Sequence, residues 1–316
     1  MGFEHVSVLL EETLAYLAPH DGGIYVDGTL GGGGHSQHIL SSCAPHGHLY
    51  GIDRDADAIA AATSRLGRSP CFTAIRGNFH DARALLAAQG VERIDGMLLD
   101  LGVSSYQLDT AERGFSYHED APLDMRMDRG QALTAREIVN TYDERELTRI
   151  LLDYGEEKWA ARIAKIICEH RAQREIATTA DLVRCVDAAI PKRVRLQDEG
   201  HSARRTFQAL RIAVNDELAP LERVVEDVVQ LLTPGGRLCV ITFHSLEDRI
   251  VKHTMRRLQN PCTCPPKAPI CTCGKKPLVR VLAGGGVKPS KDEVARNTRA
   301  RSARLRVCER LEMHNE

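Results

Sequence analysis

Residues 24–36 read Ile24-Tyr25-Val26-Asp27-Gly28-Thr29-Leu30-Gly31-Gly32-Gly33-Gly34-His35-Ser36. In this stretch an apolar run breaks into a glycine-rich turn and then into residues that can start a helix. Glycine permits positive φ angles and lets a ligand approach the backbone, and the first amides of a helix have no partner within the helix. The stretch therefore predicts a strand, a ligand-binding loop and a helix, the arrangement by which α/β folds bind nucleotide-like ligands.

A second strand pattern, His48–Asp53, ends in an acid roughly twenty residues beyond the glycines, where a carboxylate can bind both hydroxyls of a ribose. The loop does not fit a dinucleotide, because Ser36 replaces the last glycine of the G-x-G-x-x-G pattern counted from Gly31 and Gly33. Asp27 would also repel a pyrophosphate but attract a cationic amino-acid group. These residues favour S-adenosylmethionine over NAD, and therefore disfavour a dehydrogenase or a glycine turn without a ligand.

The composition fits a globular protein of one large domain or two. The chain has 316 residues, of which 43% are apolar, enough to bury a sizeable core. It shows neither the basic and apolar start of a signal peptide nor an apolar segment of membrane-spanning length. Most of its 10 cysteines are scattered in apolar runs, where a reduced thiol packs as a small hydrophobic group. We therefore expect a cytoplasmic protein with no membrane partner.

Strand and helix patterns alternate up to residue 100, with strands expected near residues 24–27, 48–53, 71–76 and 94–100. Such alternation is typical of a parallel sheet covered by helices. From Thr134 to about Arg193 only helical patterns occur. This change of pattern predicts a helical domain inserted into the α/β domain.

The sheet is expected to resume after the insertion. A helix predicted over about 206–232, interrupted near Pro220, leads to a strand over 237–242. Two further β-rich segments, 278–282 and 303–311, can close the sheet as an antiparallel pair. We accordingly place the first part of the α/β domain in residues 1–112, the inserted helical domain in residues 113–205 and the second part of the α/β domain in residues 206–316.

Ligands of open α/β sheets bind at the carboxyl ends of the strands. Asp27, Asp53 and Asp100 each stand at the end of a strand pattern. Asp100 either takes part in chemistry or caps the turn that Gly102 and the following serines form. Its position alone leaves both interpretations open.

Several longer strings carry a resemblance to a known family. From His5 to the C-terminal arginines, the chain closely resembles the RsmH (MraW) family. The strings are Asp27-Gly-Thr-Leu-Gly-Gly-Gly-Gly-His35-Ser, Asp100-Leu-Gly-Val-Ser-Ser-Tyr-Gln-Leu-Asp109, Arg113-Gly-Phe-Ser116, Pro122-Leu-Asp-Met-Arg-Met-Asp128, Arg205-Thr-Phe-Gln-Ala209 and Phe243-His-Ser-Leu-Glu-Asp-Arg249.

The resemblance implies a Rossmann-like class I S-adenosylmethionine-dependent methyltransferase with an inserted all-α domain for substrate recognition. The implied substrate is the N4 amino group of a cytosine in the decoding region of 16S rRNA, within the small ribosomal subunit. It implies no DNA partner and leaves the oligomeric state open. The implied cofactor contacts are Gly33, Gly34, His35, Asp53, Phe79, Asp100 and Gln107.

Methyl transfer to this substrate needs a group that handles the amino proton. The N4 lone pair is delocalised into the ring, so positioning must supply much of the rate. We expect Asp100 to accept an N4 hydrogen and to act as the catalytic base. Many amino-methylating enzymes carry an Asp/Asn-Pro-Pro-aromatic box at this strand end, whereas here Asp100 is followed by Leu-Gly-Val, which leaves the groups that hold the base open. The aromatic candidates for stacking on an extruded base are Tyr106, Phe115, Tyr117 and Phe243.

The charge balance bears on RNA binding. A net charge of −1 and a pI near 6.9 disfavour tight binding of naked RNA, so local basic patches must contact it. The Arg-rich C-terminal segment could present alternate arginines to phosphate, or could simply form a solvated face. The candidate patches are Lys192, Arg193 and Arg195 with Arg204 and Arg205; Lys252 with Arg256 and Arg257; Lys275 and Lys276; and Arg296, Arg299, Arg301, Arg304 and Arg306.

Cys262, Cys264, Cys271 and Cys273 form two Cys-x-Cys pairs in a proline-rich stretch. Four thiolates in so short a span can close a tetrahedral zinc site, but the pairs lack the usual Cys-x-x-Cys spacing. The alternative is a flexible reduced loop near the active cleft that becomes ordered only on the ribosome. The sequence leaves the metal content undecided.

Overall fold

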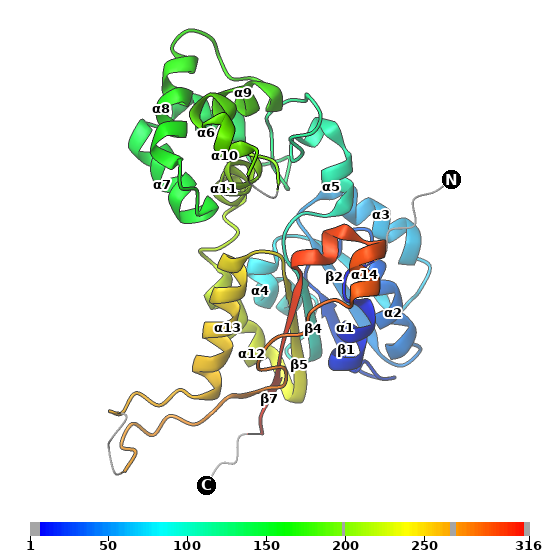
Figure 1. Ribbon diagram of the computed structural model, residues 1–316. Coiled ribbons are helices and arrows are strands. Elements are labelled where there is room, and N and C mark those ends of the chain that lie inside the picture. Colours follow the sequence, from blue (N-terminus) through cyan, green and yellow to red (C-terminus); the bar gives the residue numbers. More distant parts are fainter. Residues whose placement is uncertain (1–6, 198–199, 266–269, 313–316) are drawn as a thin grey trace. The chain divides into compact units, whose positions relative to one another are not determined.

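The computed structural model describes residues 7–197, 200–265 and 270–312 (Figure 1). Its internal contacts divide the chain into two compact units. The sheet unit comprises the residues up to Gly102 and those from Leu218 onward, and the helical unit comprises Val103–Glu217.

The sheet unit is built on a seven-stranded sheet with the order β3-β2-β1-β4-β5-β7-β6. Strands β1 to β5 pair in parallel, whereas β7 runs antiparallel to β5 and β6 runs antiparallel to β7. The alternating pattern and the antiparallel closing pair are therefore confirmed. The strands are β1 (Ile24–Asp27), β2 (His48–Asp53), β3 (Phe72–Arg76), β4 (Ile94–Asp100), β5 (Leu232–Thr242), β6 (Val279–Val281) and β7 (Arg304–Arg310).

Helices cover both faces of this sheet, as Figure 1 shows for α12 and α13 on one side and α1 and α2 on the other. Two separate cores result: successive residues of β4 alternate between them, with Met97 and Leu99 in one and Leu98 in the other. The helices of this unit are α1 (Leu10–Leu17), α2 (Gly34–Cys43), α3 (Ala56–Leu66), η1 (Phe79–Asp81), α4 (Ala82–Ala87), α12 (Leu221–Leu231), α13 (Ser245–Gln259), α14 (Lys291–Arg296) and η3 (Thr298–Ser302).

The strand order reverses between β1 and β4, because the chain fills β2 and β3 on one side of β1 before it returns to β4 on the other. Such a switch point leaves a crevice beyond the carboxyl ends of the two central strands. Asp27 ends β1 and Asp100 ends β4, so the fold brings both carboxylates to this place.

The helical unit has a single core, to which residues from Phe115 to Val214 contribute. Four of its helices begin with a side-chain cap; Asp143, for example, forms a capping box with Glu146. The helices are α5 (Ser105–Asp109), η2 (Ala111–Arg113), α6 (Ala135–Thr141), α7 (Glu144–Gly155), α8 (Ala160–Arg171), α9 (Thr179–Ala189), α10 (Lys192–Arg195) and α11 (Arg204–Asn215).

The unit boundaries differ from the expected divisions at 112/113 and 205/206. The interruption expected near Pro220 is confirmed: the segment 206–232 forms two helices, because the chain turns at Asp216, where φ is +47°, before Pro220 precedes α12. Phe207, Leu210 and Val214 of α11 lie in the core of the helical unit. Helix α12 instead packs in a core of the sheet unit. The helical unit therefore includes α11 and also the segment from Val103.

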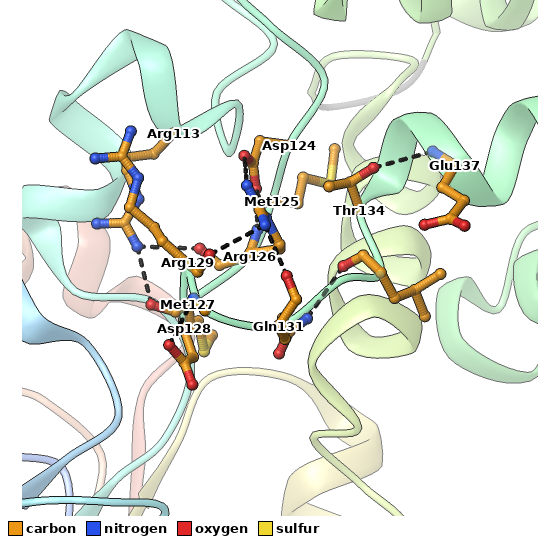
Figure 2. A network of polar contacts seen from close by, with 12 residues as sticks. Arg113, Asp124, Met125, Arg126, Met127, Asp128, Arg129, Gln131, Thr134 and Glu137 are labelled. Atoms are coloured by element: carbon orange, nitrogen blue, oxygen red, sulfur yellow. Dashed lines mark hydrogen bonds and ion pairs between the residues drawn. The ribbon is translucent and has the colours of Figure 1, made fainter.

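The segment of the helical unit between η2 and α6 is held by polar contacts rather than by a helix (Figure 2). Arg113 is 2% exposed and donates to the carbonyl oxygens of Arg126 and Met127, each at 3.0 Å. Arg126 forms a bidentate ion pair with Asp124, both contacts being 2.8 Å, and also donates to the carbonyl oxygen of Gln131. Side-chain donors thus satisfy backbone carbonyls that no helix or sheet satisfies.

We expect Gly114→Ala to destabilise the protein by at least about 2 kcal/mol, through backbone strain and overpacking. Gly114 has φ +69°, and an added Cβ would lie 2.3 Å from the carbonyl oxygen of Pro122 and 2.8 Å from the amide nitrogen of Asp124. Gly130→Ala is the matched control, since its nearest neighbour would be a side-chain oxygen of Asp128 at 3.2 Å. Urea unfolding of both variants measures the difference, and equal midpoints would contradict the prediction.

Candidate active site

The glycine loop joins β1 to α2 and approaches the end of β2. Gly33 is the N-cap of α2 with φ +77°, a backbone conformation that glycine adopts without strain. The amide of Gly31 donates to Asp53 Oδ2 at 2.8 Å. Ser36, at the place of the missing third glycine, donates its hydroxyl to Asp27 Oδ2 at 2.7 Å. The side chain of Ser36 therefore links the start of α2 to the end of β1 by a hydrogen bond. A glycine at this position would instead allow the helix to pack more closely against the strand.

Asp53 at the end of β2 is well placed for a diol. Its Oδ1 accepts the amide of Asp55 at 2.9 Å, and its Oδ2 accepts the amide of Gly31. A carboxylate has about four acceptor positions, so these two amides orient the group and leave capacity for two hydroxyl donors. Burial raises the pKa of Asp53, and the two amide hydrogen bonds oppose that rise.

Phe79, in the 3₁₀ helix that follows β3, lies beside the start of the glycine loop. A Cβ added to Gly28 would be 3.3 Å from Phe79 Cβ, and its other close neighbours would be side chains of β4. The ring is partly buried and packs edge-on to His80, with centroids 4.6 Å apart. This position, next to the glycine loop, is compatible with the cofactor contact predicted for Phe79.

Asp100 has the most unusual surroundings among the predicted site residues. Its side chain is 27% exposed, yet Oδ1 is buried and has no hydrogen-bond partner. Its backbone amide donates to Thr29 Oγ1 at 2.6 Å, which fixes the end of β4 against the glycine loop. Capping of a turn by the Asp100 side chain does not account for these contacts, so they favour a functional carboxylate.

Three acids converge at this end of the sheet. Burial, together with the negative charges of Asp27 and Glu247, raises the pKa of Asp100 to about 8. Burial also raises the pKa of Asp27 to about 6. A carboxylate with so high a pKa gains from a neighbouring positive charge, so the site suits a cationic ligand and disfavours a pyrophosphate.

His35 joins the glycine loop to Asp100. Its imidazole is 6% exposed, with Nε2 3.0 Å from the carbonyl oxygen of Val8 and Nδ1 3.7 Å from Asp100 Oδ2. The buried ring thus orients the carboxylate, and any cofactor contact by His35 falls to its backbone in the first turn of α2. Gly34 precedes it, and a Cβ there would lie 2.2 Å from Ser7 Oγ, so that position is closely packed.

Glu247 is a site residue that the sequence reasoning did not single out. It is 1% exposed in the first turn of α13, accepts the amide of Phe243 at 2.8 Å and caps the helix together with His244. The available signal was the string Phe243–Arg249, which directly follows the strand now known to pair with β4. The negative charge of Glu247 raises the pKa of Asp100, although hydrogen bonds at the start of α13 already hold the Glu247 carboxylate.

Gln107 belongs to the helical unit and has a local structural role. Its side-chain oxygen accepts a hydrogen bond from the backbone amide of Ser104 at 3.1 Å, and its backbone amide donates to Ser104 Oγ at 3.2 Å. The two bonds form a capping box at the start of α5. It is 5% exposed. A cofactor contact by Gln107 remains a prediction.

The aromatic side chains predicted to stack on a base differ in their exposure to solvent. Phe115 is 6% exposed in the core of the helical unit, so the expectation that it could stack on a base is wrong. Tyr117 stacks on His201 with centroids 4.6 Å apart, and Phe243 packs partly buried in the sheet unit. Tyr106 of α5 is 54% exposed and is the most accessible of the four.

Several candidate arginines are already engaged in ion pairs. Arg306 is 3% exposed and pairs bidentately with Asp248 at 2.7 and 2.9 Å, so it neither contacts phosphate nor belongs to a solvated face, the two alternatives considered for this segment. Arg257 pairs with Glu222 and Glu226, and Arg195 pairs with Asp187.

The fold and the site together define the class of protein. A parallel sheet with this strand order, a glycine loop that contacts the acid ending β2, and a cluster of carboxylates at the switch point fit S-adenosylmethionine, which combines a ribose with two positive charges. The chain is a class I S-adenosylmethionine-dependent methyltransferase.

Comparison with known proteins identifies the family. The chain belongs to the MraW methylase family, whose family model matches residues 2–311. It is 54% identical to ribosomal RNA small subunit methyltransferase H of Geotalea daltonii, over 98% of this chain and 99% of the relative. The protein of the same name from Symbiobacterium thermophilum is 52% identical over 100% and 99%, and that from Clostridium botulinum strain Kyoto is 51% identical over 98% and 100%. Among the described residues, no helix is both long and apolar enough to cross a membrane.

The affinity for S-adenosylmethionine should rise with pH. A cationic ligand favours the ionised form of Asp100, whose pKa of about 8 keeps it mostly protonated at pH 6. We expect Kd to fall about tenfold from pH 6 to pH 8 and then to level off. Calorimetric titration measures this. S-adenosylhomocysteine, which lacks the sulfonium charge, is the control, and an equal pH dependence for both ligands would refute the link to that charge.

Proposed function

We propose that this protein transfers a methyl group from S-adenosylmethionine to the N4 amino group of a cytosine in the decoding region of 16S rRNA. Its relatives at 51–54% identity over nearly the whole chain are named as methyltransferases of small-subunit ribosomal RNA. The family resemblance on the strings quoted above supports the cytosine N4 position. The observation that carries the chemistry is the partnerless oxygen of Asp100 at the switch point.

The reaction needs an acceptor that orients the amino group of cytosine and a base that takes its proton, and Asp100 can serve as both. The cofactor supplies an electrophilic methyl group when bound, and the protein must supply an orienting acceptor for the amino hydrogen of cytosine. Oδ1 of Asp100 is buried without a hydrogen-bond partner, while the side chain as a whole is 27% exposed and Oδ2 lies 3.7 Å from His35 Nδ1, so a rotation of the carboxylate brings an acceptor oxygen to the substrate. Because its pKa of about 8 lies near the working pH, Asp100 can accept the proton and afterwards release it to solvent.

We assign recognition of the RNA mainly to the helical unit. This unit contains a pocket of about 230 Å³, lined by Lys158, Trp159, His201, Arg204 and Arg205 among others. Cationic groups next to aromatic rings can bind phosphate and stack on bases at the same place. The exposed ring of Tyr106 offers a second stacking surface.

The near-neutral total charge favours a folded ribonucleoprotein as the substrate over naked RNA. A net charge of −1 provides little long-range attraction for a polyanion. Affinity must then come from the shape of the subunit and from local patches such as the pocket of the helical unit. The proposed place of action is the cytoplasm, where small subunits mature.

Tritium transfer from labelled S-adenosylmethionine tests the proposal. The acceptors are purified small subunits that lack the modification and free 16S rRNA, and Asp100→Ala protein runs alongside. Support would be label recovered as N4-methylcytidine from subunits, little label on free RNA, and none with the variant. Transfer to another nucleoside, or cofactor binding without transfer to either acceptor, would overturn the proposed substrate.

A further inference from the structure

The segment between α13 and β6 lacks the usual means of holding a fixed shape. None of its described residues from Asn260 to Pro277 is buried or lies in a helix or strand. Ile270, its one large aliphatic side chain among them, is 75% exposed. Figure 1 shows this part of the chain as two extended arms beyond the end of α13. Such a segment cannot be stabilised by a hydrophobic core.

Four cysteine side chains nevertheless meet between the two arms. The ligand atoms of Cys262, Cys264, Cys271 and Cys273 all lie within 4.8 Å of one another. The sulfur of Cys271 lies 3.6 Å from Cys262, 3.8 Å from Cys264 and 3.5 Å from Cys273, and Cys273 lies 3.7 Å from Cys262. A tetrahedron with zinc–sulfur bonds of about 2.3 Å has sulfur atoms about 3.8 Å apart. The four thiols are therefore spaced as the ligands of one zinc ion.

The same distances exclude disulfide pairing in this arrangement. A disulfide places its sulfur atoms about 2.05 Å apart, and all four cysteines are free thiols. Four thiols, none of them buried, would gain nothing from gathering at this distance without a bound ion, because their mutual hydrogen bonds are weak.

The Cys-x-Cys spacing accounts for the geometry. In an extended segment residues i and i+2 point to the same side, so each pair presents two sulfur atoms to the facing arm. The backbone amide of Thr272 also donates to Cys264 Sγ at 3.3 Å. Amide donors to sulfur are the outer-shell contacts that stabilise metal-bound thiolates.

We propose that Cys262, Cys264, Cys271 and Cys273 bind one Zn²⁺ ion that holds the two arms together. Four sulfur ligands leave no open position, so the site is structural rather than catalytic. The thiols lose their protons to solvent on binding, and the ion supplies the folding free energy that this segment lacks otherwise. The positive charges of Lys275 and Lys276, two and three residues after Cys273, reduce the net negative charge of the tetrathiolate.

Metal analysis of the full-length protein tests the proposal independently of methyltransferase activity. Protein purified with reductant and without chelator should contain about one zinc per chain by mass spectrometry of the element. Cys262→Ser and Cys273→Ser should each lower that content severalfold. Cys71→Ser is the matched control, a partly exposed thiol elsewhere in the chain, and should keep the zinc.

Cobalt substitution gives a second readout that needs no variant. Co²⁺ bound to the wild-type protein should show the intense visible bands of tetrahedral sulfur coordination, which added Zn²⁺ should abolish. Trypsin should also cut after Lys275 faster once a chelator has removed the metal. Protein that stays free of zinc after loading with excess Zn²⁺ under reducing conditions would overturn the proposal. Equal zinc content in wild type and both cysteine variants would also overturn it.

Discussion

Replacing Asp100 with asparagine should lower kcat for methyl transfer about 10²- to 10⁴-fold, the usual contribution of a positioned general base. The substitution keeps the shape of the side chain but removes the ability to take the amino proton. Cofactor binding at pH 8 should weaken only about tenfold, to the level of the wild type at pH 6, because the charge of Asp100 is lost while Asp53 and the glycine loop are unchanged. Single-turnover transfer to small subunits, with cofactor binding measured in parallel, tests this expectation.

The stability of the same variant provides the control. The pKa of Asp100 is raised in the folded protein, so the native state holds a proton that the unfolded state has lost between about pH 4 and pH 8. Stability of the wild type therefore falls across that window, by at most about 1.4 kcal/mol per pH unit from this group. Asp100→Asn should resist urea better than wild type at pH 8, with a smaller difference at pH 5. An inactive variant that is also less stable at pH 8 would point to misfolding instead.

Asp53→Ala should weaken S-adenosylmethionine binding at least about 10²-fold. If Asp53 binds both ribose hydroxyls as predicted, the variant loses two charge-assisted hydrogen bonds, at roughly 1.5–3 kcal/mol each. The amide of Gly31 also loses its acceptor, which loosens the glycine loop. Equilibrium binding of the cofactor measures the change.

Asp57→Ala serves as the matched control for this variant. Asp57 lies in the first turn of α3 and carries the same charge, but it does not end a strand. A similar loss of affinity in both variants would mean that Asp53 acts only through general charge, and an unchanged affinity in Asp53→Ala would exclude the ribose contact.

The strands of the sheet were predictable because each is a short apolar run bounded by turn residues. The predicted strands 24–27, 48–53 and 94–100 have the same bounds in the structure. The assignment of α11 and α12 to different units was less predictable, since the sequence indicates a break near Pro220 but not which core each helix joins. Only the two cores show that Phe207 and Val224 pack in different units.

In the candidate site, too, the sequence predicts residues at strand ends but not residues whose place depends on tertiary packing. Asp27, Asp53 and Asp100 could be found because parallel strands end on the same edge. Glu247 could not be found in this way, since its place depends on the pairing of β5 with β4 across the whole helical unit. The buried ion pair of Arg306 likewise depends on a residue of α13, which a strand pattern alone cannot indicate.

The position of β7 between β5 and β6 has a consequence for synthesis of the chain. The helical unit is one continuous stretch of sequence, so it can complete its core while the rest of the chain is still being made. Strand β5 must wait for residues 304–310, and until they emerge one of its edges has no partner. A nascent chain therefore carries a finished helical unit beside an open sheet edge, which is the stage at which it depends most on protection from aggregation.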